Sequence, residues 1–135
     1  MCPKYHLLLI FGIILSLPHP SSSQNWATFQ QKHIVGSANN INCYTQMQNS
    51  IFIIMGRCKP VNTFIVSSAT TVKAICSAVS GRADVSSSSR FQLITCRRAS
   101  DVTPPCPYNT KNDNDYICIR CENRHPVHFV KMGKC

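Results

Sequence analysis

The most informative stretch of this 135-residue chain reads Cys58-Lys59-Pro60-Val61-Asn62-Thr63-Phe64. From Asn62 to Val66 the side chains are rich in β-branched and aromatic types, which predicts a strand. The stretch therefore places a lysine between a cysteine and the start of a strand.

The segments on either side predict helices early in the chain and strands late. Trp26, Phe29, His33 and Ile34 recur at helical spacing, so we expect a short amphipathic helix over residues 25–34 that ends before Gly36. Residues 43–56 predict a second helix, although the continuously apolar residues 51–55 equally fit a buried strand. A third helical segment at 71–80 and a polar loop at 86–89 follow, and then come short β-type runs at 91–96, 116–121 and 126–130, separated by prolines and the polar stretch 109–115. This order predicts an α+β domain.

Residues 1–23 have the composition of a secretory signal peptide. Lys4 provides the positive start, residues 7–17 form an apolar run too short to span a membrane, and small residues at Ser21 and Ser23 fit a cleavage site before Gln24. We therefore expect a secreted protein whose single domain covers residues 24–135.

Cysteine content supports export. Cys2 leaves with the leader, and the even number that remains in a short exported chain predicts four disulfides. Eight cysteines allow about 105 pairings, so their spacing does not give the connectivity.

The chain is strongly basic. Its net charge is +9, and loss of Lys4 with the leader leaves +8. A small basic exported domain attracts polyanions such as nucleic acid, anionic membrane or acidic glycan, although the charge also fits a merely solvated surface.

Three histidines follow the leader: His33, His125 and His128. Imidazole titrates near neutral pH, so two of them could act as an acid and a base. On RNA, whose 2′-hydroxyl is the nucleophile, such a pair needs only a cation to stabilise the charge on phosphorus. His33 could equally be a core histidine, and His128, on the face of its strand opposite Val127 and Phe129, could be merely exposed.

The string Cys118, Cys121, His125, His128 also resembles a set of zinc ligands. The gap between its two halves is shorter than in a C₂H₂ finger, and export favours disulfides over metal binding. We therefore expect no metal and no other cofactor, and the surroundings of the C-x-x-C do not resemble a thioredoxin-like redox site.

Residues 58–64 resemble the C-K-x-x-N-T-F signature of the pancreatic ribonuclease family. Residues 24–33, QNWATFQQKH, and 121–129, CENRHPVHF, resemble the first helix and the last catalytic strand of its onconase-like amphibian branch. The resemblance implies a ribonuclease A-like α+β fold with three short helices, a bent antiparallel sheet and four disulfides. It also implies the pairs Cys43–Cys96, Cys58–Cys106, Cys76–Cys121 and Cys118–Cys135.

The same resemblance implies roles for individual residues. His33 would be the general base, His128 the general acid and Lys59 the stabiliser of the transition state. The substrate-binding residues would be Gln24, as pyroglutamate beside Lys32, together with Thr63, Phe129 and Glu122, and Arg120 and Arg124 are further candidate phosphate contacts. Thr95 stands where an aspartate usually supports the threonine that reads the pyrimidine, and Arg120 replaces the usual threonine partner of Glu122.

The implied activity is endonucleolytic cleavage of single-stranded RNA after pyrimidines, without a metal, through a 2′,3′-cyclic phosphate. The alternative keeps the fold but makes the protein a cationic host-defence or sialoglycan-binding protein that acts at anionic cell surfaces. The apolar residues 51–55 are the one feature that could serve a membrane-active protein, and a buried core segment is the interpretation we favour. We expect a monomer with no stable protein partner.

Overall fold

The computed structural model describes residues 24–39 and 41–135. The predicted signal peptide, residues 1–23, lies outside the described residues. In the described part there are three α-helices, two 3₁₀ turns and nine strands: α2 Trp26–His33, β1 Ile34–Val35, α3 Cys43–Gln46, η1 Ser50–Phe52, β2 Ile53–Ile54, β3 Arg57–Cys58, β4 Val61–Val66, α4 Ala69–Lys73, η2 Ala74–Cys76, β5 Arg82–Ser86, β6 Phe91–Arg98, β7 Tyr108–Asp115, β8 Ile117–Glu122 and β9 His125–Met132.

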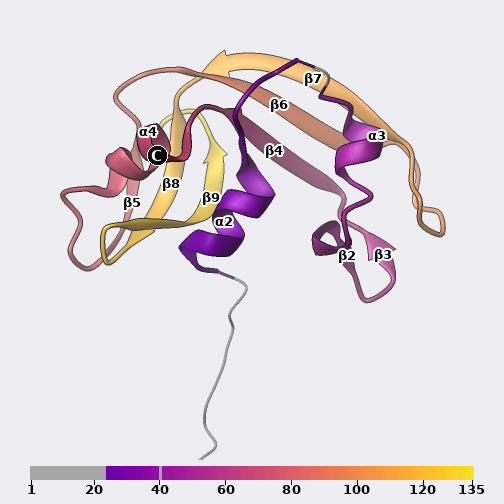
Figure 1. Ribbon diagram of the computed structural model, residues 1–135, viewed down its shortest axis with the longest axis horizontal. Coiled ribbons are helices and arrows are strands. Elements are labelled where there is room, and N and C mark those ends of the chain that lie inside the picture. The colour runs from indigo at the N-terminus through magenta and orange to yellow at the C-terminus, as the bar shows by residue number, and fades with distance from the viewer. Residues whose placement is uncertain (1–23, 40) are drawn as a thin grey trace, which may run out of the picture.

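The strands form two sheets and a small hairpin. One sheet has the order β1-β4-β6-β7, the other has the order β5-β8-β9, and β2 pairs with β3. All pairs are antiparallel except β1 with β4. Figure 1 shows α2 between the two halves of the molecule, where it packs against β4 of the first sheet and β9 of the second. Side chains from α2, β4 and β9 therefore meet where the two sheets come together.

Helix α2 has a defined start and a buried face. Asn25 caps it by accepting a hydrogen bond from the Thr28 amide at 2.9 Å. Phe29 and His33, four residues apart, are its buried residues. The chain continues directly into β1, so His33 lies at the junction of helix and sheet.

The core consists of two clusters of buried side chains. One is built around Phe29, Val72 and Ile119, and the other around Met47, Phe52 and Phe64. Each contains a disulfide, Cys76–Cys121 in the first and Cys43–Cys96 in the second. The further bridges are Cys58–Cys106 and Cys118–Cys135, so the four pairs are those that the family resemblance implied.

The apolar residues 51–55 are only partly a core segment. Phe52 is buried, but β2 and β3 turn at Met55 and Gly56, and there Ile54 is 56 % and Met55 95 % exposed. The expected second helix is also much shorter, since α3 ends at Gln46 and a 3₁₀ turn follows at residues 50–52. Strands β2 and β3 have only two residues each, so the hairpin cannot bury one whole face and its sequence does not alternate between apolar and polar residues.

Two strands of five or more residues, β5 and β7, have no counterpart in the sequence prediction. Residues 109–115, expected to separate strands, lie within β7, and residues 82–86 form β5. Each is at the edge of its sheet. Most side chains of β7 are exposed, so the strand needs no apolar alternation.

None of the helices in the described part of the chain has the length and apolar character that crossing a bilayer requires.

Candidate active site

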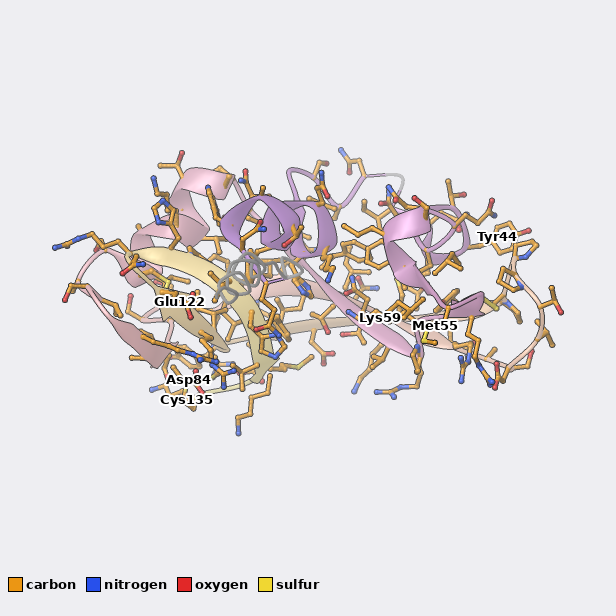
Figure 2. All side chains as sticks on the ribbon, turned by 90° about the horizontal axis from the view of Figure 1, so that it is seen from below. Tyr44, Met55, Lys59, Asp84, Glu122 and Cys135 are labelled. Atoms are coloured by element: carbon orange, nitrogen blue, oxygen red, sulfur yellow. A yellow bond between two sulfur atoms is a disulfide. The ribbon has the colours of Figure 1, made fainter. Side chains whose placement is uncertain are left out.

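A cleft of about 450 Å³ lies where α2 meets the two sheets. It brings together seven of the predicted site residues from three distant parts of the chain, namely Gln24, Lys32, His33, Lys59, Thr63, His128 and Phe129. Its other polar lining residues are Asn62, Thr95, Arg97 and Lys131. Glu122 lies on β8 and does not line this cleft; Figure 2 shows it apart from Lys59.

The ring of His33 is buried and oriented by the backbone. Its Nδ1 lies 2.8 Å from the carbonyl oxygen of Thr63, to which it donates a hydrogen bond. The ring stacks on Phe129 at 5.3 Å between centroids and is 5.1 Å from that of Phe29. Burial, together with the charges of Lys59 and Lys32, lowers the pKa of His33 to about 3, against the opposing effect of the hydrogen bond to Thr63. His33 is thus a neutral imidazole whose other nitrogen, Nε2, carries the lone pair.

His128 lies on β9 and is more exposed than His33. Its Nδ1 is 3.5 Å from Nε2 of Gln24, the first described residue of the chain. Burial lowers the pKa of His128, and the charges of Arg120 and Lys59 lower it further. The two imidazoles therefore enter one cleft from different elements, one buried and one accessible.

Lys59 is held by Asn62, for which the sequence predicted no role. Asn62, almost fully buried, accepts a hydrogen bond from Lys59 Nζ at 2.9 Å and donates one to the carbonyl oxygen of Lys32 at 2.8 Å. The hydroxyl of Tyr108 donates to the carbonyl of Lys59 at 2.6 Å. Asn62 thus joins β4 to the end of α2 and fixes the ammonium group beside the cleft. A buried polar residue in the predicted strand was the signal that could have identified it.

The side chains of Thr63 and Thr95 face each other. They lie on paired strands, β4 and β6, and their hydroxyl oxygens are 3.1 Å apart. Beside a carboxylate, which only accepts hydrogen bonds, the Thr63 hydroxyl would have to donate. Beside the hydroxyl of Thr95 it can either donate or accept.

A row of charged and titratable side chains that includes His128 crosses the β5-β8-β9 sheet. Asp84, Arg120 and His128 are direct partners on β5, β8 and β9. Two hydrogen bonds, of 2.8 and 3.3 Å, join the Arg120 guanidinium to the Asp84 carboxylate. Glu122 lies two rows away along β8, with its carboxylate 3.5 Å from Arg82. Arg124 lies further away, at the turn between β8 and β9.

Comparison with known proteins shows the family. Residues 24–130 match the family described as pancreatic ribonuclease. The chain belongs to the pancreatic ribonuclease family. It is 58 % identical over 135 residues to an oocytes ribonuclease of Aquarana catesbeiana, an alignment that covers 100 % of this chain and 99 % of the relative.

Solved structures show the same fold. Amphinase, a cytotoxic ribonuclease from Rana pipiens oocytes, aligns with a TM-score of 0.72 and 40 % identity over 82 % of this chain and 98 % of its own. A cytotoxic ribonuclease of Rana catesbeiana, complexed with d(ApCpGpA) and (2′,5′CpG), aligns with a TM-score of 0.73 and 32 % identity over 83 % of this chain and 99 % of its own. The chain is therefore an RNA-binding endoribonuclease with a ribonuclease A-like α+β fold.

Two disulfides exclude the alternative in which Cys118, Cys121, His125 and His128 bind zinc. Cys118 is bonded to Cys135 and Cys121 to Cys76, so neither sulfur can be a thiolate ligand. His125 instead places Nδ1 2.8 Å from the carbonyl oxygen of Asn123 and its ring 6.3 Å from that of Trp26.

Proposed function

We propose that this ribonuclease cleaves single-stranded RNA on the 3′ side of pyrimidines with His33, His128 and Lys59. His33 removes the proton from the 2′-hydroxyl, whose oxygen attacks phosphorus. His128 protonates the departing 5′-oxygen, and Lys59 stabilises the extra negative charge on the five-coordinate phosphorus. The product is a 2′,3′-cyclic phosphate, which water then opens with the two histidine roles reversed.

The observation that carries this proposal is that two histidines, from α2 and β9, and a lysine from the link between β3 and β4 line a single cleft. Because Nδ1 of His33 is committed to the Thr63 carbonyl, Nε2 is left as a proton acceptor. An anionic phosphate in the cleft raises the pKa of both histidines, which brings the buried base into a useful range. No step in this scheme uses a metal ion.

The base upstream of the cut would lie against Thr63 and Phe129. The Thr63 hydroxyl can donate to cytosine or accept from uracil, and the amide beside it serves as the second contact. With Thr95 rather than a carboxylate as its partner, either arrangement of the hydroxyls is available, so we expect both pyrimidines to be accepted. Glu122 would contact the base downstream of the cut.

Further parts of the proposal concern the mature protein. It is a secreted monomer that starts at Gln24 once residues 1–23 are removed. The freed amino group of Gln24 attacks its own side-chain amide, and pyroglutamate forms with loss of ammonia. Gln24 already lines the cleft with Lys32 and contacts His128, so the new ring would lie at the active site.

The test is cleavage of poly(U) and poly(C) by the mature protein in the presence of a chelator. We expect activity in the wild type and loss of nearly all of it in His33→Ala and in His128→Ala, with a 2′,3′-cyclic phosphate at the new ends. His125→Ala is the matched control, because its ring lies outside the cleft. Full activity in both active-site variants would end this assignment.

A second candidate function uses the same fold at an anionic cell surface. The mature charge of +8 and the exposed tip of the β2–β3 hairpin, Ile54 and Met55, favour binding to bacterial membranes or to sialylated glycans. RNA cleavage would then be secondary.

A further inference from the structure

A small cavity of about 180 Å³ adjoins the active-site cleft, and Thr95 lies in the wall of both. On its β7 side this cavity is lined by Lys111 and Asp113. We propose that Asp113 is a positioning residue for base recognition. Through a water molecule in the cavity, its carboxylate accepts a hydrogen bond from Thr95 and thereby favours cleavage after uracil over cleavage after cytosine. This inference rests on the proposed contact between Thr63 and the pyrimidine.

One oxygen of the Asp113 carboxylate is buried without a partner. Within residues 24–39 and 41–135, Oδ2 is the only buried side-chain oxygen or nitrogen that lacks a hydrogen bond. The other oxygen, Oδ1, lies 3.9 Å from Nζ of Lys111, whose side chain is 78 % exposed, so this ion pair contributes little to stability. A buried carboxylate oxygen without a donor is unfavourable, and a bound water molecule is the usual partner of such a group.

The pairing of the strands places Asp113 next to the two threonines. Thr63 on β4 pairs with Thr95 on β6, and Thr95 pairs with Lys111 on β7, so these three side chains share one face of the sheet. Asp113 is two residues further along β7 and lies on the same face, diagonal to Thr95. Diagonal neighbours are roughly 7–8 Å apart, which leaves a gap between hydroxyl and carboxylate that one water molecule fills. The cavity has room for that water molecule.

A carboxylate at the end of this row sets the direction of its hydrogen bonds. The hydroxyl oxygens of Thr63 and Thr95 are 3.1 Å apart, and either can be the donor. Asp113 only accepts, so the bridging water donates to it and turns its own oxygen towards the Thr95 proton. The Thr95 oxygen then accepts from Thr63, and the Thr63 oxygen accepts from N3–H of uracil. Cytosine N3 carries no proton and needs Thr63 as the donor, which reverses the row. Both pyrimidines are therefore accepted, with uracil favoured.

The experiment measures the ratio of kcat/KM for UpG to kcat/KM for CpG. We expect a ratio above one in the wild type and a ratio about five-fold lower in Asp113→Asn, because the amide can donate as well as accept. The effect should require the Thr95 hydroxyl, so Asp113→Asn in a Thr95→Val background should leave the ratio of that background unchanged. A purely structural role of Asp113 would instead lower kcat/KM on both substrates together.

Matched controls separate the possible failures. Lys111→Gln removes the ion pair of Asp113 but keeps its carboxylate, and it should retain the wild-type ratio. Asp113→Thr tests the same point if Asp113→Asn does not fold, because a hydroxyl both donates and accepts.

Four results would overturn the role of Asp113: a wild-type ratio of one or less, an equal loss on both substrates in the Asp113 variants, the same change of ratio in the Thr95→Val background, or a lowered ratio in Lys111→Gln. An unchanged ratio in Thr63→Val would show that the proposed pyrimidine contact fails, and this inference with it. If the wild type cleaves neither dinucleotide, the proposed cleavage itself fails.

Discussion

The buried imidazole of His33 links catalysis to stability. In the unfolded chain its pKa is near the usual 6.5, whereas in the folded protein burial holds the pKa at about 3. Between these two values the unfolded chain binds a proton that the folded protein does not. The free energy of unfolding contributed by this residue is therefore fully present above pH 6.5 and is lost as the pH falls towards 3.

This linkage predicts a difference between the wild type and His33→Gln. On going from pH 7 to pH 5, the wild type should lose more unfolding free energy than the variant, by at most about 1.4 kcal/mol per pH unit. Urea unfolding at both pH values measures the difference. Because His128 and all carboxylates are present in both proteins, their titration cancels in the comparison. Equal losses would show that the His33 ring is not buried as a neutral group.

The charge of Arg120 beside His128 predicts a second effect, on the pH dependence of kcat/KM. Its charge lowers the pKa of His128, and its pairing with Asp84 reduces the opposite effect of that carboxylate. In Arg120→Gln both changes raise the pKa of His128. Since the general acid must be protonated, the alkaline limb of kcat/KM against pH should shift upward by a few tenths of a pH unit or more. Lys134→Gln, a cation over the Tyr116 ring, is the control, and an alkaline limb unchanged or moved downward in Arg120→Gln would contradict the role.

At the scale of single elements, the disulfide Cys118–Cys135 ties the chain end to β8. It closes a segment with a sequence separation of 17, and the Cys135 amide also donates to the Ser86 hydroxyl at 2.9 Å. We expect the double variant Cys118→Ala/Cys135→Ala to lose about 3 kcal/mol of unfolding free energy. Its activity at 25 °C should change little, because the β8–β9 ladder still holds His128. Urea unfolding and poly(C) cleavage test this together, and an unchanged unfolding free energy would show that the ladder alone fixes the chain end.

The elements also show what sequence reasoning could predict. Helix α2 was predicted because its apolar residues recur at helical spacing. Strands β4, β6, β8 and β9 were predicted because they contain short runs of β-branched, aromatic and other apolar residues, many of which are buried. Edge strands β5 and β7 lie largely in solvent, so their polar sequences carry no such pattern. The hairpin tip at Met55 was missed for the opposite reason, because its apolar side chain is exposed.

The candidate site was predictable only in part. The family motif identified His33, Lys59 and His128 as candidates, and the structure brings them into one cleft. Their hydrogen-bond partners depend on contacts between distant segments, such as that between Asn62 and the Lys32 carbonyl, which no local pattern reveals. The ion pair of Arg120 with Asp84 depends likewise on the register between β8 and β5.

For the molecule as a whole, RNA cleavage and binding to cell surfaces would depend on different parts of the protein. The exposed hairpin tip and the strongly positive net charge do not depend on whether a copy of the protein can cleave RNA. A catalytically inactive His128→Ala variant therefore separates the two functions. If RNA cleavage is the main activity, the variant should no longer kill bacteria that the wild type kills.

The control for that assay is Met55→Ser, which keeps the active site and makes the hairpin tip polar. Bacterial killing that survives in His128→Ala but falls in Met55→Ser would support the membrane-active alternative. Agglutination of cells that is equal in wild type and His128→Ala, and blocked by free sialic acid, would support the glycan-binding alternative.

Strand β7 has a consequence for how the protein behaves at high concentration. Within residues 24–39 and 41–135 no strand pairs with its outer edge, and an open edge invites strands from other molecules to add to it. Here the edge carries Lys111, Asp113 and Asp115, whose charges would be brought against those of an incoming copy. The polar composition of β7, which prevented its prediction from the sequence, should therefore also reduce aggregation through this edge.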